Sequence, residues 1–328
     1  MKKLSLDEIR AMPPAEVVDG LRKRRFSLLQ SLGFRKLRTE MKLTGFVCWA
    51  IIAPTGLRKE VNPEPHPINL QSKGRAKVEK ILRKAAPCTL KGYLPNPDYG
   101  MAIGFNHPSL GEILRFIYIC VQAKNQKINL FPVNLPWYEA IMPIVNELEE
   151  IGIFVMPVIT PSTRRKMAKN ADETTMAVVD DLSKALNALY LQKCVEFIKS
   201  GNRVWVAPTA TRQRTVFKTD ACRFGMEAIE PQTMTFLAIA LRRSKIQDCL
   251  FQVIGVKPPE DFGRGLNLFK VYNMAVGAEM SLQTALFEAR SKLECGGSSF
   301  EHSFLLKIAN AVESLGGKDI IVPKTEES

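Results

Sequence analysis

Several features that would assign this chain of 328 residues to a class of protein are absent from it. It contains no run of about 18 uncharged apolar residues, so we expect no membrane-spanning helix. Its seven cysteines are scattered and form no Cys-x-x-Cys pair, which argues against a disulfide framework or a zinc site and favours a reducing compartment. The first residues lack an apolar core followed by a small-residue cleavage site, so we expect no secretory signal and a protein that is not secreted.

Positive charge is what the chain has in excess. Lysine and arginine number 46 against 33 aspartate and glutamate residues, which gives a formal net charge of +13. Such an excess indicates an anionic partner, which can be a nucleic acid, an anionic membrane surface, or an acidic or phosphate-bearing ligand. A nucleic-acid surface would interleave exposed aromatic side chains with basic ones, but the basic segment 22–42 holds only Phe26 and Phe34. A basic nucleic-acid-binding module is therefore the less favoured alternative, and no nucleic acid is expected as a partner.

Hydrophobic periodicity divides the chain into two regions. Residues 1–95 predict a smaller N-terminal helical domain, with helices at 4–12, 15–41 and 73–86. Residues 96–328 alternate strands and helices. The strands are predicted at 101–105, 128–133, 153–159, 204–207, 235–241 and 250–256, and the helices at 112–121, 138–150, 172–200 and 300–315. This alternation predicts an α/β fold whose mainly parallel central sheet is flanked by helices.

Histidine is rare, with three residues in the whole chain. His66 lies in a proline-rich turn and His302 in the last predicted helix, and both positions favour a surface role. His107 differs because it follows the predicted strand 101–105, and functional sites of α/β sheets gather where strands end. Glu112, five residues later, can accept a hydrogen bond from one imidazole nitrogen and leave the other as a general base. The spacing alone leaves open a loop histidine that caps the following helix.

Three segments resemble blocks of the glycerolipid (lysophospholipid) acyltransferase superfamily. Residues 106–112, Asn-His-Pro-Ser-Leu-Gly-Glu, are similar to its NHxxxxD block, with Glu112 in place of the usual aspartate. Residues 201–214 resemble its strand, proline turn and Arg-x-Arg sequence, in the form found in the soluble plastid-type glycerol-3-phosphate acyltransferases. Residues 153–167 resemble a strand followed by a turn with serine and basic residues in the same subfamily. The resemblance covers residues 100–214 in motif and the whole chain in outline.

The resemblance implies an O-acyltransferase that moves a fatty acyl group from an acyl thioester to a hydroxyl of glycerol 3-phosphate, the first step of glycerophospholipid synthesis. It implies that His107 removes the proton from the acceptor hydroxyl, while Glu112 orients His107 and stabilises the imidazolium. It also implies a site for the acceptor phosphate made of Arg165, Lys166, Arg212 and Arg214, and guanidinium groups suit phosphate oxygens. No metal and no resident cofactor is implied. The acyl donor is a thioester of acyl carrier protein or of coenzyme A.

Two departures from the family's blocks keep the acceptor open. Thr209 and Ala210 stand where members often have Glu-Gly or Ser-Gly, and Lys166 stands where the plastid-type turn usually has histidine. Lysophosphatidate (1-acylglycerol 3-phosphate) is therefore the alternative acceptor. The apolar segment 43–53 bears on this choice, because a shallow hairpin in contact with a membrane would favour the lipid acceptor, whereas an ordinary part of the core would not. The positive charge has two uses that stay open, docking an acidic acyl carrier protein and holding the enzyme peripherally on an anionic membrane.

Overall fold

The structure is a computed structural model that describes residues 2–52, 70, 72–96, 98–107, 110–122, 124–207, 239–240, 242–246, 249–259, 261, 266–281, 310–311 and 314–315. The chain forms two compact units, each assembled from two segments. The first unit comprises residues 1–78 and 130–193, and the second comprises residues 79–129 and 194–328. Both units therefore draw on both sides of the predicted division at residue 95, which stays a prediction about independent domains.

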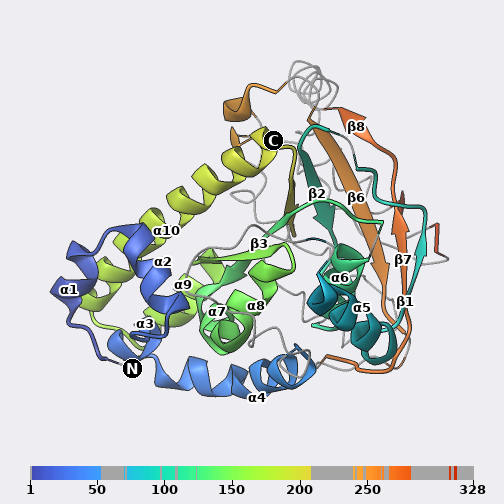
Figure 1. The fold of residues 1–328 in the computed structure, drawn as a ribbon. Helices are drawn as coiled ribbons and strands as arrows, with labels where there is room; N and C mark the ends of the chain where they lie inside the picture. Colours follow the sequence, from blue (N-terminus) through green and yellow to red (C-terminus); the bar gives the residue numbers. More distant parts are fainter. Residues whose placement is uncertain are drawn as a thin grey trace, which may run out of the picture. The chain divides into compact units, whose positions relative to one another are not determined.

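The N-terminal part of the first unit is helical, as predicted (Figure 1). Its helices are α1 (Leu6–Ala11), α2 (Pro14–Arg22), α3 (Leu28–Ser31) and α4 (Arg35–Ile52). Helix α1 begins with a capping box, in which the Ser5 hydroxyl accepts from the Glu8 N–H and the Glu8 carboxylate accepts from the Ser5 N–H. Because these bonds satisfy backbone donors at the helix start, the boundary predicted at residue 4 is nearly correct.

The single helix predicted at 15–41 is wrong, because three separate helices cover that segment. Arg24 and Gly33 both have a positive φ, 54° and 83°, which a continuous right-handed helix does not allow. Ser27 then starts α3 by accepting a hydrogen bond from the Gln30 N–H. The apolar spacing in this segment is helical on average, but it carries no signal for two left-handed residues.

Helix α4 bears on the two interpretations of the apolar segment 43–53, and it buries only part of that segment, since Phe46 is 59% exposed. The hairpin is wrong, since α4 continues as a helix to Ile52. Gly45, Cys48 and Ile52 lie on one side of it and are buried. A Cβ atom on Gly45 would stand only 2.2 Å from the carbonyl oxygen of Ala140, so α4 packs its backbone closely against that residue.

The rest of the first unit begins with a strand and ends in a long helix. The elements are β3 (Asn129–Asn134), α7 (Leu135–Ile141), the 3₁₀ turn η3 (Met142–Ile144), α8 (Val145–Glu150), β4 (Ile153–Val158), α9 (Pro161–Ala168) and most of α10 (Glu173–Lys199). Strands β3 and β4 are neighbours in a sheet. The single helix predicted at 138–150 is wrong, because Pro143 lacks the N–H that a continuous α-helix needs and the chain passes through η3 there.

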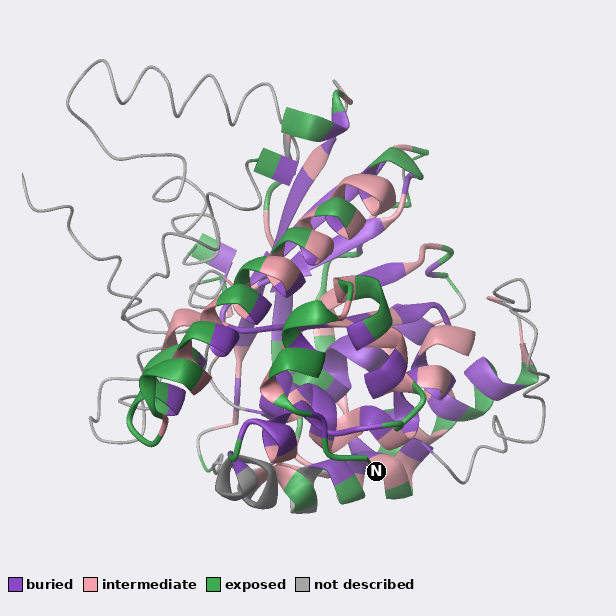
Figure 2. Ribbon diagram, turned by 90° about the vertical axis from the view of Figure 1, so that its left-hand side faces the viewer, coloured by how far each residue is buried: buried purple, intermediate pink, exposed green. Residues whose placement is uncertain are grey.

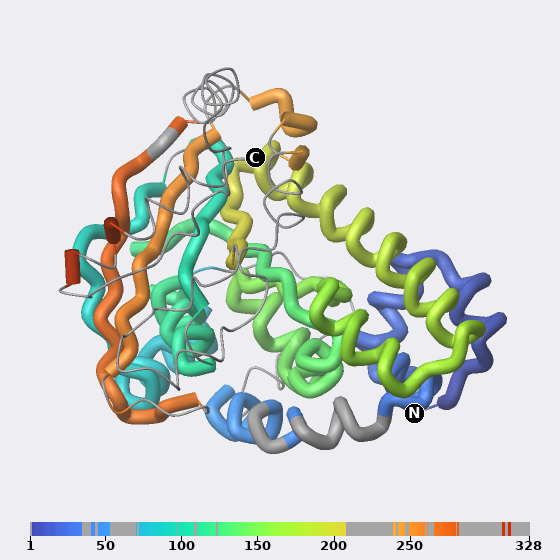
Figure 3. Tube along the Cα trace, turned by 180° about the vertical axis from the view of Figure 1, so that it is seen from behind, coloured from blue at the N-terminus to red at the C-terminus, as the bar shows by residue number. Residues whose placement is uncertain are grey.

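The second unit is built on a mainly parallel sheet, which confirms the predicted α/β class (Figure 1). Its elements are most of α5 (Lys73–Ala85), then β1 (Cys88–Lys91), β2 (Met101–Phe105), α6 (Gly111–Val121), β5 (Arg203–Val206), β6 (Leu250–Lys257), β7 (Tyr272–Val276) and β8 (Met280–Ser281). The strand order is β1-β7-β6-β2-β5, with β8 paired to β6. Three pairs are parallel, β1 with β7, β6 with β2, and β2 with β5, whereas β7 and β8 run antiparallel to β6. Figure 3 shows these strands as adjacent tubes from the opposite side.

The register of the strands defines the edge at which the site lies. Phe105, at the end of β2, is level with Ile254 in β6, and Lys257, at the end of β6, is level with Asn273 at the start of β7. Strand β1 starts level with β7, at Cys88 opposite Tyr272. The ends of β2 and β6 and the starts of β7 and β1 therefore share one edge of the sheet, which we call the carboxyl edge of β2.

The core of the second unit surrounds β2. All five residues of this strand are buried, as expected for a strand with a neighbour on each side and helices against its face (Figure 2). Phe116 of α6 packs on Phe105 and Trp205, with ring centres 4.5 Å and 5.1 Å apart. The indole N–H of Trp205 donates to Oδ1 of Asn129 at 2.8 Å, so its one polar atom is satisfied inside the core.

The remaining predictions divide into correct, wrong and outside the described residues. Strands at 101–105, 128–133, 153–159, 204–207 and 250–256 are confirmed within two residues. The strand at 235–241 is wrong at its described positions, because 239–240 and 242–244 are helical and bury Ala240 and Ser244, four residues apart. Strands β1, β7 and β8 were not predicted. The helix predicted at 300–315 lies almost entirely outside the described residues. Within that range, residues 310–311 are described and are helical. No helix in the described ranges is both long and apolar enough to cross a membrane.

Candidate active site

The first residue after β2 is held to β6 through its side chain. Oδ1 of Asn106 accepts a hydrogen bond from the Val256 N–H at 2.7 Å, and Nδ2 of Asn106 donates to the Val256 carbonyl at 2.8 Å. The Asn106 side chain is fully buried. These two bonds are the ones that the backbone of a paired strand would make with Val256. The chain therefore leaves the sheet in a fixed direction just before His107.

His107 and Glu112 are in contact at the carboxyl edge of β2. Nδ1 of the histidine and Oε1 of the glutamate form a hydrogen bond. None of the Glu112 side chain is exposed, whereas 16% of the His107 side chain is. Nε2 of His107 makes no hydrogen bond with any residue that the structure describes. Since a carboxylate only accepts, the proton of a neutral imidazole sits on Nδ1 and Nε2 keeps its lone pair, which is the arrangement that a general base needs.

The start of α6 is fixed against β7 by a glycine and a buried arginine. A Cβ atom on Gly111 would lie 2.3 Å from the hydroxyl oxygen of Tyr272, so this position requires glycine. The guanidinium carbon of Arg115, one turn later, lies 4.2 Å from the centre of the Tyr272 ring. Arg115 also donates to the carbonyl groups of Gly111, Leu266, Asn267 and Lys270. Glu112 is therefore held on a helix turn that has little freedom to move.

Positive charge near Glu112 compensates for its burial. Burial lowers the pKa of Arg115, whereas Tyr272, Cys88 and Glu112 act in the opposite direction and favour the charged guanidinium. Glu112 also lies in the first turn of α6, where the helix dipole favours a negative charge. Arg115 and the start of α6 therefore both place positive charge beside the buried Glu112 side chain.

Three thiols of the described residues are poor nucleophiles, those of Cys48, Cys88 and Cys249. Burial raises the pKa of Cys48 and of Cys88 to about 11 and that of Cys249 to about 12. All three are therefore protonated thiols at neutral pH, and the thiolate is the reactive form. This agrees with an imidazole, rather than a sulfur, as the reactive group of the site.

The structure places only two of the four predicted phosphate-binding residues. Arg165 and Lys166 are exposed neighbours in the last turn of α9, which Thr160 caps by accepting from the Thr163 N–H, so the predicted turn is a helix. They belong to the first compact unit, and His107 belongs to the second. Arg212 and Arg214 lie outside the described residues. Phosphate binding by these four residues stays a prediction.

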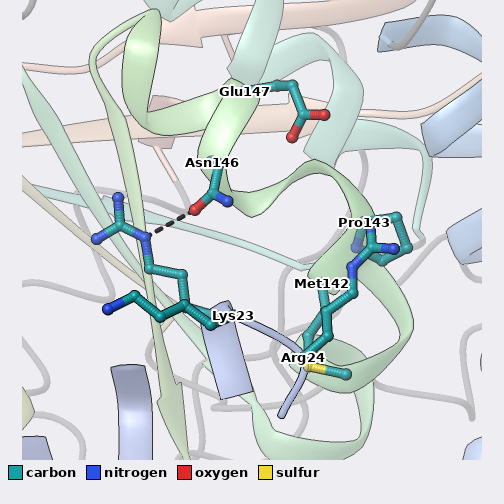
Figure 4. Close-up of a pocket in the computed structure, with 7 residues that line it drawn as sticks. Lys23, Arg24, Met142, Pro143, Asn146 and Glu147 are labelled. Carbon is teal, nitrogen blue, oxygen red and sulfur yellow. Dashed lines mark hydrogen bonds between the residues drawn. The ribbon is translucent and has the colours of Figure 1, made fainter. Parts of the chain in front are cut away.

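Basic residues also line a hollow of about 310 Å³ in the first unit (Figure 4). It is lined by Arg22, Lys23, Arg24, Met142, Pro143, Asn146 and Glu147. Arg22 donates to Oδ1 of Asn146 at 2.7 Å and pairs with Glu149, while Lys23 pairs with Asp19 at 2.9 Å. The bonds of Arg22 join α2 to α8, so the packing of these two helices explains this part of the hollow.

Sequence reasoning missed three residues that hold the site. Asn106 could have been found, since a polar side chain between a buried strand and a candidate base needs a partner. Arg115 and Tyr272 give no such signal, because an arginine on a helix is usually exposed and Tyr272 lies in a strand that was not predicted.

Comparison of the sequence with models of known protein families and with curated proteins gives no match. Among the residues that the structure describes, no group of three or more histidine, cysteine, aspartate or glutamate side chains could hold a metal ion. The function is therefore inferred from the geometry around His107 and from the resemblance of the sequence blocks.

Proposed function

We propose that the protein is an O-acyltransferase that moves a fatty acyl group from a thioester to a hydroxyl of glycerol 3-phosphate. The observation that carries the proposal is the hydrogen bond between Oε1 of Glu112 and Nδ1 of His107, which leaves Nε2 as the base. The resemblance of residues 106–112 to the acyltransferase block supplies the class of reaction, and the net charge of +13 agrees with anionic substrates.

The proposed reaction needs one general base and no covalent enzyme intermediate. Nε2 of His107 takes the proton from the acceptor hydroxyl while the hydroxyl oxygen attacks the thioester carbonyl carbon. The new C–O bond forms, the C–S bond breaks, and the departing sulfur takes the proton back from the imidazolium. Glu112 stabilises the positive imidazolium between these steps, because its buried carboxylate faces Nδ1. A thiol, with an ordinary pKa of about 8.5, leaves without a stronger acid.

Glycerol 3-phosphate is preferred over lysophosphatidate as the acceptor. A membrane hairpin at segment 43–53 was one argument for the lipid acceptor, and this segment continues as helix α4 to Ile52 instead. Arg165, Lys166, Arg212 and Arg214 are proposed to bind the acceptor phosphate. Acyl carrier protein or coenzyme A is proposed as the carrier of the acyl group, and the reaction is placed in the cytoplasm or the plastid stroma.

The direct test is an acyl-transfer assay with a radiolabelled acyl group. Thioesters of acyl carrier protein and of coenzyme A are offered as donors, each with glycerol 3-phosphate or lysophosphatidate. The wild-type chain is expected to label glycerol 3-phosphate, and His107→Ala is expected to lower kcat by about 10²-fold or more. His66→Ala and His302→Ala, the only other histidines of the chain, serve as matched controls and should retain activity.

Different results would correct different parts of the proposal. Labelling of lysophosphatidate alone would keep the reaction and change the acceptor. Equal activity of His107→Ala and the wild type would show that His107 is not the base. An absence of transfer with every donor and acceptor pair would reject the acyltransferase assignment.

A further inference from the structure

A short loop of the second unit exposes two apolar side chains at the carboxyl edge of β2. Phe269 is 74% exposed and Val271 is 49% exposed. Both precede β7 directly, and β7 begins at the same edge at which β2 ends. An aromatic ring exposed to water contributes little to the stability of the fold. Two such apolar side chains at one place therefore indicate a contact with an apolar partner.

The backbone holds Phe269 in this exposed position at an energetic cost. Its φ is 63°, in the left-handed region that bulky residues rarely adopt because the Cβ atom crowds the backbone there. The loop is nevertheless well anchored. Arg115 donates to the carbonyl groups of Leu266, Asn267 and Lys270, and the Phe269 N–H donates to the Ala85 carbonyl at 2.8 Å. An exposed, strained and firmly held aromatic residue is better explained by binding than by packing.

The same anchor brings positive charge to the loop. Ala85 is the last residue of α5, so Phe269 lies next to the basic C-terminal turn of that helix. Lys80 and Lys84 are exposed and four residues apart on one helix face, where like charges repel each other. Neither lysine is paired with a carboxylate among the described residues, whereas Arg83 is paired with Glu79 at 2.9 Å.

We propose that Phe269, Val271, Lys80 and Lys84 form a surface that docks the second unit on a bilayer containing anionic phospholipid. A ring and an aliphatic group that enter the headgroup region, beside lysines that face lipid phosphates, are the features of an interfacial membrane contact. The net charge of +13 provides the long-range attraction. The surface lies at the edge of the sheet that carries His107, and this proposal stands whether or not acyl transfer is confirmed.

The test measures partition of the purified full chain onto vesicles. Vesicles of phosphatidylcholine alone are compared with an equimolar mixture of phosphatidylcholine and phosphatidylglycerol, by flotation. The wild-type chain is expected to float with the mixed vesicles and not with phosphatidylcholine. Lys80→Glu/Lys84→Glu is expected to lower the partition coefficient about 20-fold or more, because each lysine near an anionic surface contributes about fivefold. Phe269→Asn is expected to lower it about fivefold, and asparagine tolerates the left-handed backbone that phenylalanine occupies here.

Each variant has a matched control on the opposite edge of the same sheet. Tyr93 is also an exposed aromatic, at 69%, but it follows the end of β1, so Tyr93→Asn controls for Phe269→Asn. Lys124→Glu/Lys199→Glu produces the same change of charge at exposed positions beside the starts of β2 and β5. Both controls should float as the wild type does, and thermal unfolding of all variants should match.

Three results would overturn the proposal. The first is equal flotation with both kinds of vesicle, and the second is an equal loss of flotation in the control variants. The third is the absence of vesicle binding together with binding of an acidic acyl carrier protein that Lys80→Glu/Lys84→Glu abolishes. That last result would assign the surface to a protein partner.

Discussion

The side chain of Asn106 bonds both backbone groups of Val256, accepting at 2.7 Å and donating at 2.8 Å. This one amide therefore continues the pairing of β2 with β6 by one residue, at the point where the main chain turns away toward His107. An aspartate would fit the same space but would have no N–H to donate, which makes the pair a sharp test of how the site is held.

Asn106→Asp is expected to destabilise the protein by about 2–4 kcal/mol at neutral pH, because the Val256 carbonyl loses its donor and a charge is buried beside it. Burial raises the pKa of such a carboxyl, and the protonated form can donate again. The lost stability should therefore return as the pH falls. Urea unfolding at several pH values measures this, with the exposed Asn170→Asp as control, and a cost that does not depend on pH would contradict it.

Glu112→Gln is expected to lower kcat by about 10²–10⁴-fold with a small effect on stability. The glutamine amide can donate to Nδ1, which forces the proton of the neutral imidazole onto Nε2 and removes the base. Glu112→Asp keeps a carboxylate and should retain much more activity. Steady-state kinetics separate kcat from KM, and a glutamine variant that changes KM alone would mean that Glu112 acts on binding rather than on the base.

Gly111→Ala is expected to cost about 1–3 kcal/mol and to lower activity, because the new methyl group would stand 2.3 Å from the Tyr272 hydroxyl oxygen. Tyr272→Phe removes that oxygen and should recover part of the loss. A double-mutant cycle on the free energy of unfolding measures the coupling between the two positions. Additive effects would show that the helix start relaxes by another route and that Tyr272 does not hold it in place.

The sequence predicts the backbone of the site better than it predicts the side chains that hold the site in place. Residues 101–105 are short, apolar and bounded by polar residues, so both the strand and the position of His107 after it follow from local pattern. Their spacing allowed the contact between His107 and Glu112 but also left open a loop histidine that caps the helix, and the structure shows the contact. Arg115 could not be predicted, because its partners are carbonyl groups about 150 residues away in a loop without periodicity.

The helix breaks were missed for a related reason. Apolar spacing predicts which face of a segment is buried, and in segment 15–41 it is helical on average. Arg24 and Gly33 interrupt the helix because both have a positive φ. Of the two, only glycine is a residue type that indicates a positive φ in a sequence. The phosphate-binding residues remain predictions because Arg212 and Arg214 lie outside the described residues, and Arg165 and Lys166 belong to a different unit from His107.

The pairing of Arg22 with Glu149 in the first unit predicts how stability changes with pH. Burial raises the pKa of Glu149 to about 7, although Arg22 acts to lower it. A carboxyl whose pKa is raised by folding binds its proton more tightly in the native state than in the unfolded chain, where its pKa is 4.5. The contribution of Glu149 to the free energy of unfolding is therefore most favourable below pH 4.5. It becomes less favourable as the pH rises to 7.

Glu149→Gln should remove this dependence, since glutamine does not titrate. Relative to that variant, the wild type is expected to lose up to about 3 kcal/mol between pH 4.5 and 7. Arg22→Gln removes the cation that favours the charged carboxylate, so the loss should begin at similar pH and continue to a higher one. Denaturant unfolding across this range measures the free energy of unfolding of all three chains. If that free energy changed with pH in the same way for the wild type and for Glu149→Gln, the prediction would be wrong. Glu149 would then be ionised throughout, because its pairing with Arg22 outweighs its burial.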